Sequence, residues 1–266
     1  MRLALPAVRF PAFRYLFGAI ALYFLFLIVT APAWLIVWAL PKFAPFPITV
    51  QESYGSLWRG EFNGVNASLP TGQNLRFDTI KWQKKPWHLL RGELAASVDL
   101  AGPQLQGKGT VAKGLFGGIK LLDVTASAPA SLLPIAVPAL AIWSPAGTLD
   151  LSTAKFSYAG TASDGKANVT WRQAALALSP VKPLGEYGLA IDAKDGALNY
   201  QLTTVSGALQ LEGKGRWAAN GAPTFLGSAR AQPNFAAQLA DLLRLLGIPD
   251  ASGSVPLRYQ PPGSQR

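Results

Sequence analysis

The stretch Glu93-Leu-Ala-Ala-Ser-Val-Asp-Leu100 decides the fold class of this chain. Four apolar side chains alternate in it with three polar ones: Leu94, Ala96, Val98 and Leu100 against Glu93, Ser97 and Asp99. Successive residues of a strand point to opposite faces of a sheet, so this alternation predicts a strand with one buried face and one wet face.

Similar short segments follow one another along most of the chain, separated by glycine-containing turns. We predict strands over residues 62–69, 75–82, 93–100, 148–151, 154–158, 167–171, 174–178, 187–191, 197–202 and 208–211, with a thin strand between Leu105 and Val111. Two Asp-Gly pairs, Asp164-Gly165 and Asp195-Gly196, are typical of hairpin turns. The fold class is therefore mainly β, with an antiparallel, β-rich domain.

Two segments depart from the strand pattern. The apolar run from Ser131 to Trp143 carries Pro134 and Pro138, which exclude a regular spanning helix and disfavour a central strand. We expect a short irregular or helical connector there, docked on the sheet.

Near the end of the chain, apolar residues recur at helical spacing, at Phe235, Leu239, Leu242, Leu243 and Leu246. This pattern predicts a short amphipathic helix with Asn234 as its N-cap, and Gly247 and Pro249 end it. Packing of this helix on the sheet is the expected role, and binding of a partner is the alternative.

The two halves of the β region resemble each other. The pairs are Gly55-Ser-Leu57 with Gly147-Thr-Leu149, Ile80-Lys-Trp82 with Val169-Thr-Trp171, and Leu105-Gln-Gly-Lys-Gly109 with Leu211-Glu-Gly-Lys-Gly215. We interpret residues 53–144 and 145–266 as two similar β-layers. Coincidence in a sequence rich in Gly, Ala and Leu is the alternative.

An apolar stretch, Tyr15–Leu40, precedes the β region and contains no charged residue. It is long enough to cross a bilayer core of about 30 Å as a helix. Residues 1–14 are basic, so the positive-inside rule places them in the cytoplasm and the bulk of the chain in the periplasm. Residues 41–52 are expected to form a Pro-rich stalk. The side chains that we expect in this membrane anchor are Tyr15, Leu16, Phe17, Leu22, Phe24, Leu27, Trp34 and Trp38.

Two alternatives to a retained anchor exist, a cleaved signal peptide and a buried soluble helix. Ala31-Pro-Ala33 resembles a cleavage site. However, apolar sequence continues from Trp34 to Trp38, and Pro32 lies inside that site, so we favour the uncleaved anchor. Pro32 is expected to kink or end the helix.

Composition gives no support for an enzyme. The chain has no cysteine and a single histidine, His88, and its acidic residues are scattered, so no catalytic, metal or cofactor site can be nominated. The lack of cysteine fits an oxidising compartment. Residues 51–266 carry 20 basic and 14 acidic side chains, a net charge of +6, without a basic stripe, so nucleic-acid binding is not expected.

Several motifs in this order resemble one family. They are Thr30-Ala-Pro-Ala-Trp-Leu35, Gly55-Ser-Leu-Trp-Arg-Gly60, Leu89-Leu-Arg-Gly-Glu-Leu94, Ala167-Asn-Val-Thr-Trp171 and Leu242-Leu-Arg-Leu-Leu-Gly247. Together they are similar to protein N of the type II secretion system of Gram-negative bacteria. The resemblance implies an accessory, non-catalytic protein of the cell inner membrane that takes part in the export of folded proteins, with other inner-membrane and periplasmic secretion components as partners.

Two functions therefore remain open. The first is the accessory role, with exposed aromatic residues as candidate partner contacts: Trp58, Trp82 and Trp87. The alternative is lipid binding or transfer, because a two-faced sheet rich in Leu, Ala and Val can curl into an apolar groove, as AsmA-like proteins do by analogy of fold.

Overall fold

The computed structural model describes residues 11–44, 46–69, 72, 74–85, 88, 92–114, 117–159, 162–218 and 221–259. Trp87, one of the three expected partner contacts, lies outside these residues.

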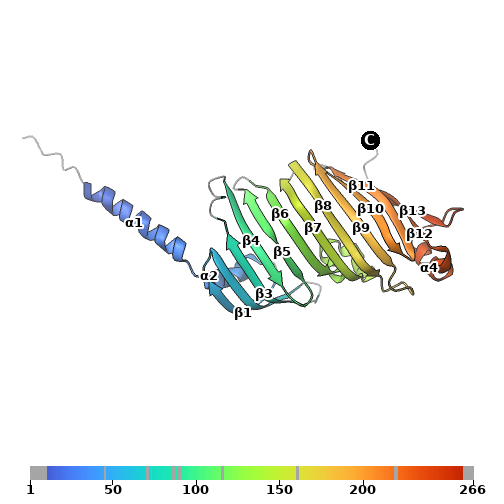
Figure 1. Ribbon diagram of the computed structural model, residues 1–266, viewed down its shortest axis with the longest axis horizontal. Coiled ribbons are helices and arrows are strands. Elements are labelled where there is room, and N and C mark those ends of the chain that lie inside the picture. Colours follow the sequence, from blue (N-terminus) through green and yellow to red (C-terminus); the bar gives the residue numbers. More distant parts are fainter. Residues whose placement is uncertain are drawn as a thin grey trace, which may run out of the picture.

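The β region forms one continuous sheet of 13 strands in which each strand pairs antiparallel with the next strand in the chain (Figure 1). The strands are β1 (Ile48–Gly55), β2 (Arg59–Ser68), β3 (Asn74–Lys84), β4 (Glu93–Ala101), β5 (Gln106–Gly114), β6 (Ile119–Pro129), β7 (Ala146–Ala159), β8 (Ala162–Ala175), β9 (Gly185–Lys194), β10 (Ala197–Gly207), β11 (Leu209–Ala218), β12 (Thr224–Ala231) and β13 (Ser254–Tyr259). The antiparallel β class is confirmed. The two halves that we interpret as similar β-layers form one continuous sheet, because β6 and β7 pair across the boundary between them.

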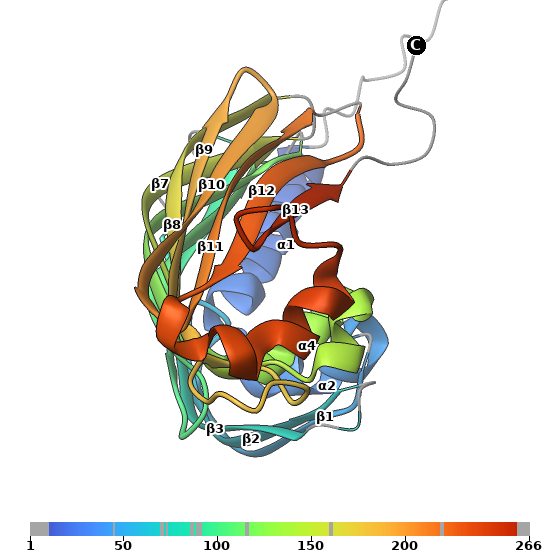
Figure 2. The same ribbon diagram turned by 90° about the vertical axis from the view of Figure 1, so that its right-hand side faces the viewer.

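The helices all lie on one side of this sheet or at its beginning. They are α1 (Pro11–Thr30), α2 (Trp34–Phe43), the connector formed by η2 (Ala130–Leu132), α3 (Leu133–Ala136) and η3 (Pro138–Trp143), then η4 (Pro233–Phe235) and α4 (Ala236–Leu246). Viewed from its end, the sheet is curved, and α2, the connector and α4 lie inside the curve near one end of the strands (Figure 2). We call the side that bears the helices the inner face and the opposite side the outer face.

Several local predictions can be compared with the structure. Asp195 and Gly196 form the two-residue turn between β9 and β10, with φ angles of 52° and 76°, so this hairpin prediction is confirmed. The prediction for Asp164-Gly165 is wrong, because Gly165 lies inside β8 opposite Phe156. The connector over residues 131–143 is helical, as expected, and its Trp143 packs against a buried cluster near α4.

The C-terminal helix is confirmed, but its predicted N-cap is wrong. Residues 233–235 form a 3₁₀ turn, and the N-cap of α4 is Phe235, which makes no side-chain capping hydrogen bond. Strand β13, which follows α4, was not predicted, because its six residues include Pro256 and too few alternating positions. The segments predicted at 148–151 and 154–158 are both parts of β7, and 167–171 is part of β8. Only Ala174 and Ala175 of the segment predicted at 174–178 belong to β8, and register shifts interrupt the alternation in both strands.

The N-terminal apolar region forms two helices. α1 ends at Thr30, and Pro32 lies before α2, so the predicted effect of Pro32 is confirmed. α2 continues through Pro41 to Phe43, and β1 already begins at Ile48, so much of the expected stalk is helix or strand. Among the described residues, no helix combines the length and apolarity needed to cross a bilayer. The anchor at residues 15–40 therefore stays a prediction.

The buried side chains of the inner face gather at the two ends of the sheet. Under α4 the core is formed by Leu184, Ala208, Leu209, Ala229, Ala231, Leu239, Leu242, Leu243 and Val255, which we call the C-terminal cluster. Beside α2 it is formed by Ala33, Phe62 and Val65, which we call the N-terminal cluster. Between these clusters the sheet carries no equally large core in its described residues.

Candidate functional site

A row of apolar residues crosses the inner face from β2 to β13. Residues that are directly opposite in neighbouring strands point to the same face of a sheet, so the strand register defines the row. Its members are Phe62, Ile80, Leu100, Gly107, Ala126, Leu151, Val169, Leu189, Leu202, Gly213, Gly227 and Leu257, which we call the inner row. An apolar row therefore runs across the sheet from β2 to β13.

Glycines in this surface make room for aromatic rings of the neighbouring strands. A Cβ atom at Gly213 would clash with the Phe225 ring, and one at Gly215 would clash with the Tyr200 ring. The rings of Tyr200 and Phe225 are stacked, with their centres 6.2 Å apart. This packing explains the Gly-Lys-Gly motif in β11: the two glycines point inward beneath the rings, and the lysine between them points outward.

The central part of the inner face is only half-buried. Leu189 and Leu202 keep an intermediate exposure, whereas Leu209 and Leu239, under α4, are 2% and 0% exposed. The difference arises because the helices cover only one end of the strands and no second sheet packs on the remainder within the described part of the chain. The inner face is therefore an apolar surface that the fold leaves open to solvent.

Two lysines are the only charged side chains that the register places on the inner face of the described strands. Lys84 is opposite Ala96, and Lys113 is opposite Leu94 and Ile119. The Lys84 ammonium lies 5.5 Å from the centre of the Trp58 ring. Burial lowers the pKa of Lys84, because removal from water disfavours the charged form. The inner face thus carries positive charge and no carboxylate.

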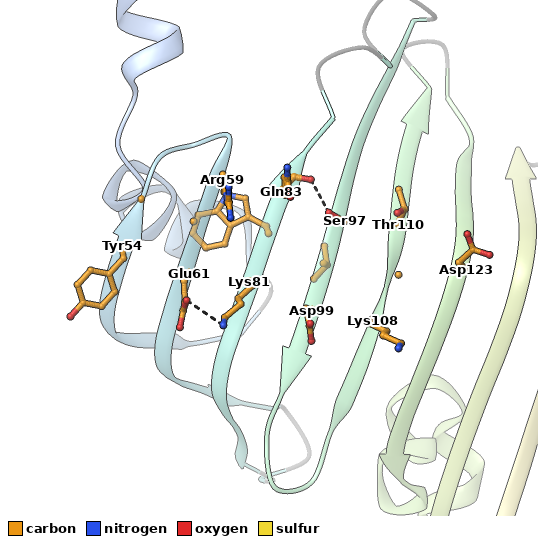
Figure 3. A pocket seen from close by; sticks show the side chains of 15 residues that line it. Tyr54, Arg59, Glu61, Lys81, Gln83, Ser97, Asp99, Lys108, Thr110 and Asp123 are labelled. Carbon is orange, nitrogen blue, oxygen red and sulfur yellow. Dashed lines mark hydrogen bonds and ion pairs between the residues drawn. The ribbon is translucent and has the colours of Figure 1, made fainter.

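The outer face is polar, and in β2–β5 opposite charges face one another across neighbouring strands. Four outer-face residues that are opposite one another in the neighbouring strands β2–β5 alternate in charge: Glu61, Lys81, Asp99 and Lys108. Figure 3 shows these side chains on the face opposite α2, around an open hollow of about 850 Å³. Lys81 Nζ lies 3.6 Å from Glu61 Oε2. Such exposed cross-strand ion pairs keep a sheet face solvated and contribute little stability.

His88 belongs to a small charged group on the outer face. Its Nδ1 atom lies 3.6 Å from a carboxylate oxygen of Glu93, and the ammonium of Lys120 binds the other oxygen. The hydrogen bond from Lys120 lowers the pKa of Glu93. In the described residues no three His, Asp or Glu side chains lie close enough to hold a metal ion. This arrangement is that of an ion-pair group at the surface.

The expected partner contacts differ in how they are packed. Trp58 is half-buried at the turn between β1 and β2. Trp82 is also half-buried, packs against Phe62 with ring centres 4.4 Å apart, and donates its Nε1–H to the Leu57 carbonyl at 3.3 Å. Trp82 thus has an internal structural role. Partner binding by Trp58, Trp82 and Trp87 stays a prediction.

The expected anchor residues are divided between α1 and α2. Leu16, Leu22 and Leu27 of α1 are exposed, and α1 extends away from the sheet at its β1 end (Figure 1). Trp34 and Trp38 of α2 are also exposed, and the Lys42 ammonium lies 3.6 Å from the centre of the Trp38 ring. The side chains of Tyr15, Phe17 and Phe24 lie outside the described part of the structure.

Sequence reasoning did not identify the inner row or its two lysines as one surface. The signal was present in the alternation of each strand, since Leu94 and Lys113 both lie on the alternating apolar faces of their strands. However, Leu94 and Lys113 are neighbours only because β4 pairs with β5, and the periodicity of a single strand does not predict that pairing.

The open, curved antiparallel meander with apolar N-terminal helices defines a class of β-sheet proteins in which one apolar face stays partly open to solvent. The sequence matches the family described as Type II secretion system (T2SS), protein N over residues 47–258, which covers nearly the whole sheet. It is also 31% identical over 242 residues to the Type II secretion system protein N of Aeromonas hydrophila, covering 88% of this chain and 92% of that protein. No solved structure matches significantly. The chain therefore belongs to the type II secretion system protein N family, and the resemblance found in the sequence is confirmed.

Proposed function

We propose that this protein is an accessory, non-catalytic component of the type II secretion system, held at the inner membrane by its N-terminal helices with its sheet in the periplasm. The observation that carries the proposal is the match to the secretion family over nearly the whole sheet. The lack of a catalytic or metal cluster among the described residues is compatible with it.

The membrane attachment is supported by the surface of α1 and by the charge before it. All of its described large side chains are apolar and exposed, including Leu22, Tyr23 and Phe26, which are 68%, 60% and 62% exposed. An apolar surface of this size is unfavourable in water and favourable in lipid. Arg2, Arg9 and Arg14 on the N-terminal side favour a cytoplasmic N-terminus.

The role in secretion is tested by deleting the gene in a bacterium that has the whole machine. We expect exported proteins to accumulate in the periplasm instead of the medium, and a plasmid copy of the full chain to restore their release. The measurement is the fraction of an exported enzyme in the culture medium. Normal secretion in the deletion strain would contradict the proposal.

The partner contact is tested by photo-cross-linking in the same cells. A benzoylphenylalanine in place of Tyr54, which is exposed in β1 and precedes Trp58 by four residues, is expected to capture an inner-membrane or periplasmic secretion component. Gln210, exposed at the other end of the sheet, is the matched control position. Capture from Gln210 alone would show that the contact does not lie near Trp58.

A further inference from the structure

The helices leave part of the inner face uncovered, and this part carries exposed apolar side chains. α2, the connector and α4 cover one end of the strands (Figure 2). Toward the other end, five large side chains of this face are each about half exposed: Leu94, Ile119, Tyr158, Trp217 and Tyr259. A contiguous apolar surface that remains open in a soluble domain marks a binding site.

Several polar groups of this face are already paired within the chain, although the buried Ser163 hydroxyl is not. Tyr200 donates its hydroxyl hydrogen to the Thr224 carbonyl at 2.6 Å, and Trp217 donates its Nε1–H to the Gly221 carbonyl at 3.1 Å. The same holds for other inner-face groups, which bind backbone carbonyls: Thr153, Trp171, Tyr187 and Thr204. A protein interface usually has about one hydrogen bond per 100–200 Å². The inner face offers few free groups for such bonds, so its chemistry fits hydrocarbon better than a protein surface.

The charges of the face point to an acidic amphiphile. Lys84 and Lys113 lie on strands β3 and β5, which are two strand spacings or about 10 Å apart. The row that they flank contains Ala96 and Val111 and no acid. A ligand with an apolar tail and an anionic head would satisfy both the apolar rows and the two lysines, whereas a neutral hydrocarbon would leave the lysines without a counter-charge.

We propose that the inner face binds the acyl chains of a membrane phospholipid along the inner row, with the lipid phosphate at Lys84 and Lys113. This binding goes beyond the role in secretion and does not depend on it. The lipid source is the bilayer to which the N-terminal helices are proposed to attach the chain.

The position of the lipid is tested with the full chain in living cells grown with radioactive phosphate. Benzoylphenylalanine replaces Leu121 or Phe156 on the inner face, within a few strands of Lys113, and Leu122 or Ser157 as matched controls. Each control is the chain neighbour of a test residue and points to the outer face. After irradiation and denaturing electrophoresis, we expect phosphate label on the chain from Leu121 and Phe156 and only background from the controls.

Three results would overturn the proposal. They are equal labelling from both faces, no labelling from the inner positions, and capture of a second protein chain instead of lipid at those positions. Protease resistance of each variant in membranes confirms that it is folded, so that loss of label is not due to unfolding.

The role of the lysines is tested by charge reversal in the chain that carries the cross-linker at Leu121. The double variant K84E/K113E should lose label roughly three- to tenfold, which is about the contribution of two exposed ion pairs. The matched control K155E/K214E makes the same charge change on the outer face, and its label should be unchanged. Equal losses in both double variants would contradict phosphate binding by Lys84 and Lys113.

Discussion

The two ends of the sheet are covered by helices in different ways. α4 buries Leu239 and Leu242 completely against β12 and β13, whereas α2 packs on β1–β3 through the smaller Ala33 and the half-buried Ile36 and Val37. α2 exposes Trp34 and Trp38 on its other side. The C-terminal end of the sheet is therefore stabilised mainly by its own core. The N-terminal end, in contrast, presents apolar surface that is compatible with a membrane.

The largest expected effect comes from the C-terminal cluster. Leu242→Ala removes a side chain that is 1% exposed, and we expect it to lower the free energy of unfolding by about 3–5 kcal/mol, since it leaves a cavity. At the N-terminal end, Ile36→Ala should cost only about 1–2 kcal/mol, because Ile36 is half-buried. Urea denaturation of the full chain in detergent measures both. Leu245→Ala, an exposed position in α4, is the control, and a cost there as large as at Leu242 would contradict the comparison.

A smaller effect is expected at the buried phenol of Tyr187. Its hydroxyl donates to the Leu209 carbonyl at 2.9 Å, so Tyr187→Phe should cost about 1–2 kcal/mol at neutral pH. Burial raises the pKa of Tyr187, and the protonated form is therefore the one stabilised by folding. This contribution is complete below the pKa of an unfolded tyrosine, about 10, and is lost as the pH rises above it.

Measurements at alkaline pH distinguish the effect of the raised pKa of Tyr187 from the effect of its hydrogen bond. The wild-type chain should lose stability between about pH 10 and pH 12 more steeply than Tyr187→Phe, because only the wild type must release a buried proton. Denaturation midpoints measured across this pH range provide the test. Parallel curves for the two proteins would mean that Tyr187 titrates normally.

Trp82 and Trp171, which occur in similar motifs of the two halves, allow a further comparison. Trp82 donates to the Leu57 carbonyl at 3.3 Å, and Trp171 donates to the Ala146 carbonyl at 3.0 Å, in both cases 25 residues earlier in the chain. Trp82→Phe and Trp171→Phe should therefore each cost about 1 kcal/mol in urea denaturation. Trp217→Phe, whose indole bonds within its own exposed turn, serves as the control and should cost less. Very different losses at Trp82 and Trp171 would argue against equivalent roles.

The smallest expected effect concerns the outer face. The hydrogen bond from Lys120 lowers the pKa of Glu93, so folding favours its ionised form. The resulting stabilisation is present above the pKa of an unfolded glutamate, about 4.3, and is lost as the pH falls through the lower folded value. Glu93→Gln should remove this part of the acid sensitivity, as measured by thermal unfolding between about pH 3 and pH 6. An unchanged acid profile would contradict it.

Some of the structure follows from local pattern. The alternation at Glu93–Leu100, the Asp195-Gly196 turn and the apolar spacing of α4 each predict an element that the structure contains. These features depend on residues that are close in the sequence, where backbone geometry alone decides which side chains share a face.

Local pattern misled where register shifts change the periodicity. A shift between Ser152 and Lys155 in β7 and another between Trp171 and Ala174 in β8 divide the alternation into four short segments, although each strand is a single element of 14 residues. Asp123, with a φ of 50°, likewise moves the inner face of β6 from even to odd positions toward Leu121. The sequence of an irregular strand therefore resembles that of a turn, and the strand is recognised only when its partner strand is known.

The sequence by itself determined the β class, the proline break after α1, the C-terminal helix and the family. Only the tertiary structure decided that the two similar halves form one sheet and that Lys84 and Lys113 lie on the same open apolar face, two strands apart. The physical reason is that alternation specifies which residues of one strand share a face. Which strands are neighbours, and in what register, is set by hydrogen bonds between segments that are distant in the chain.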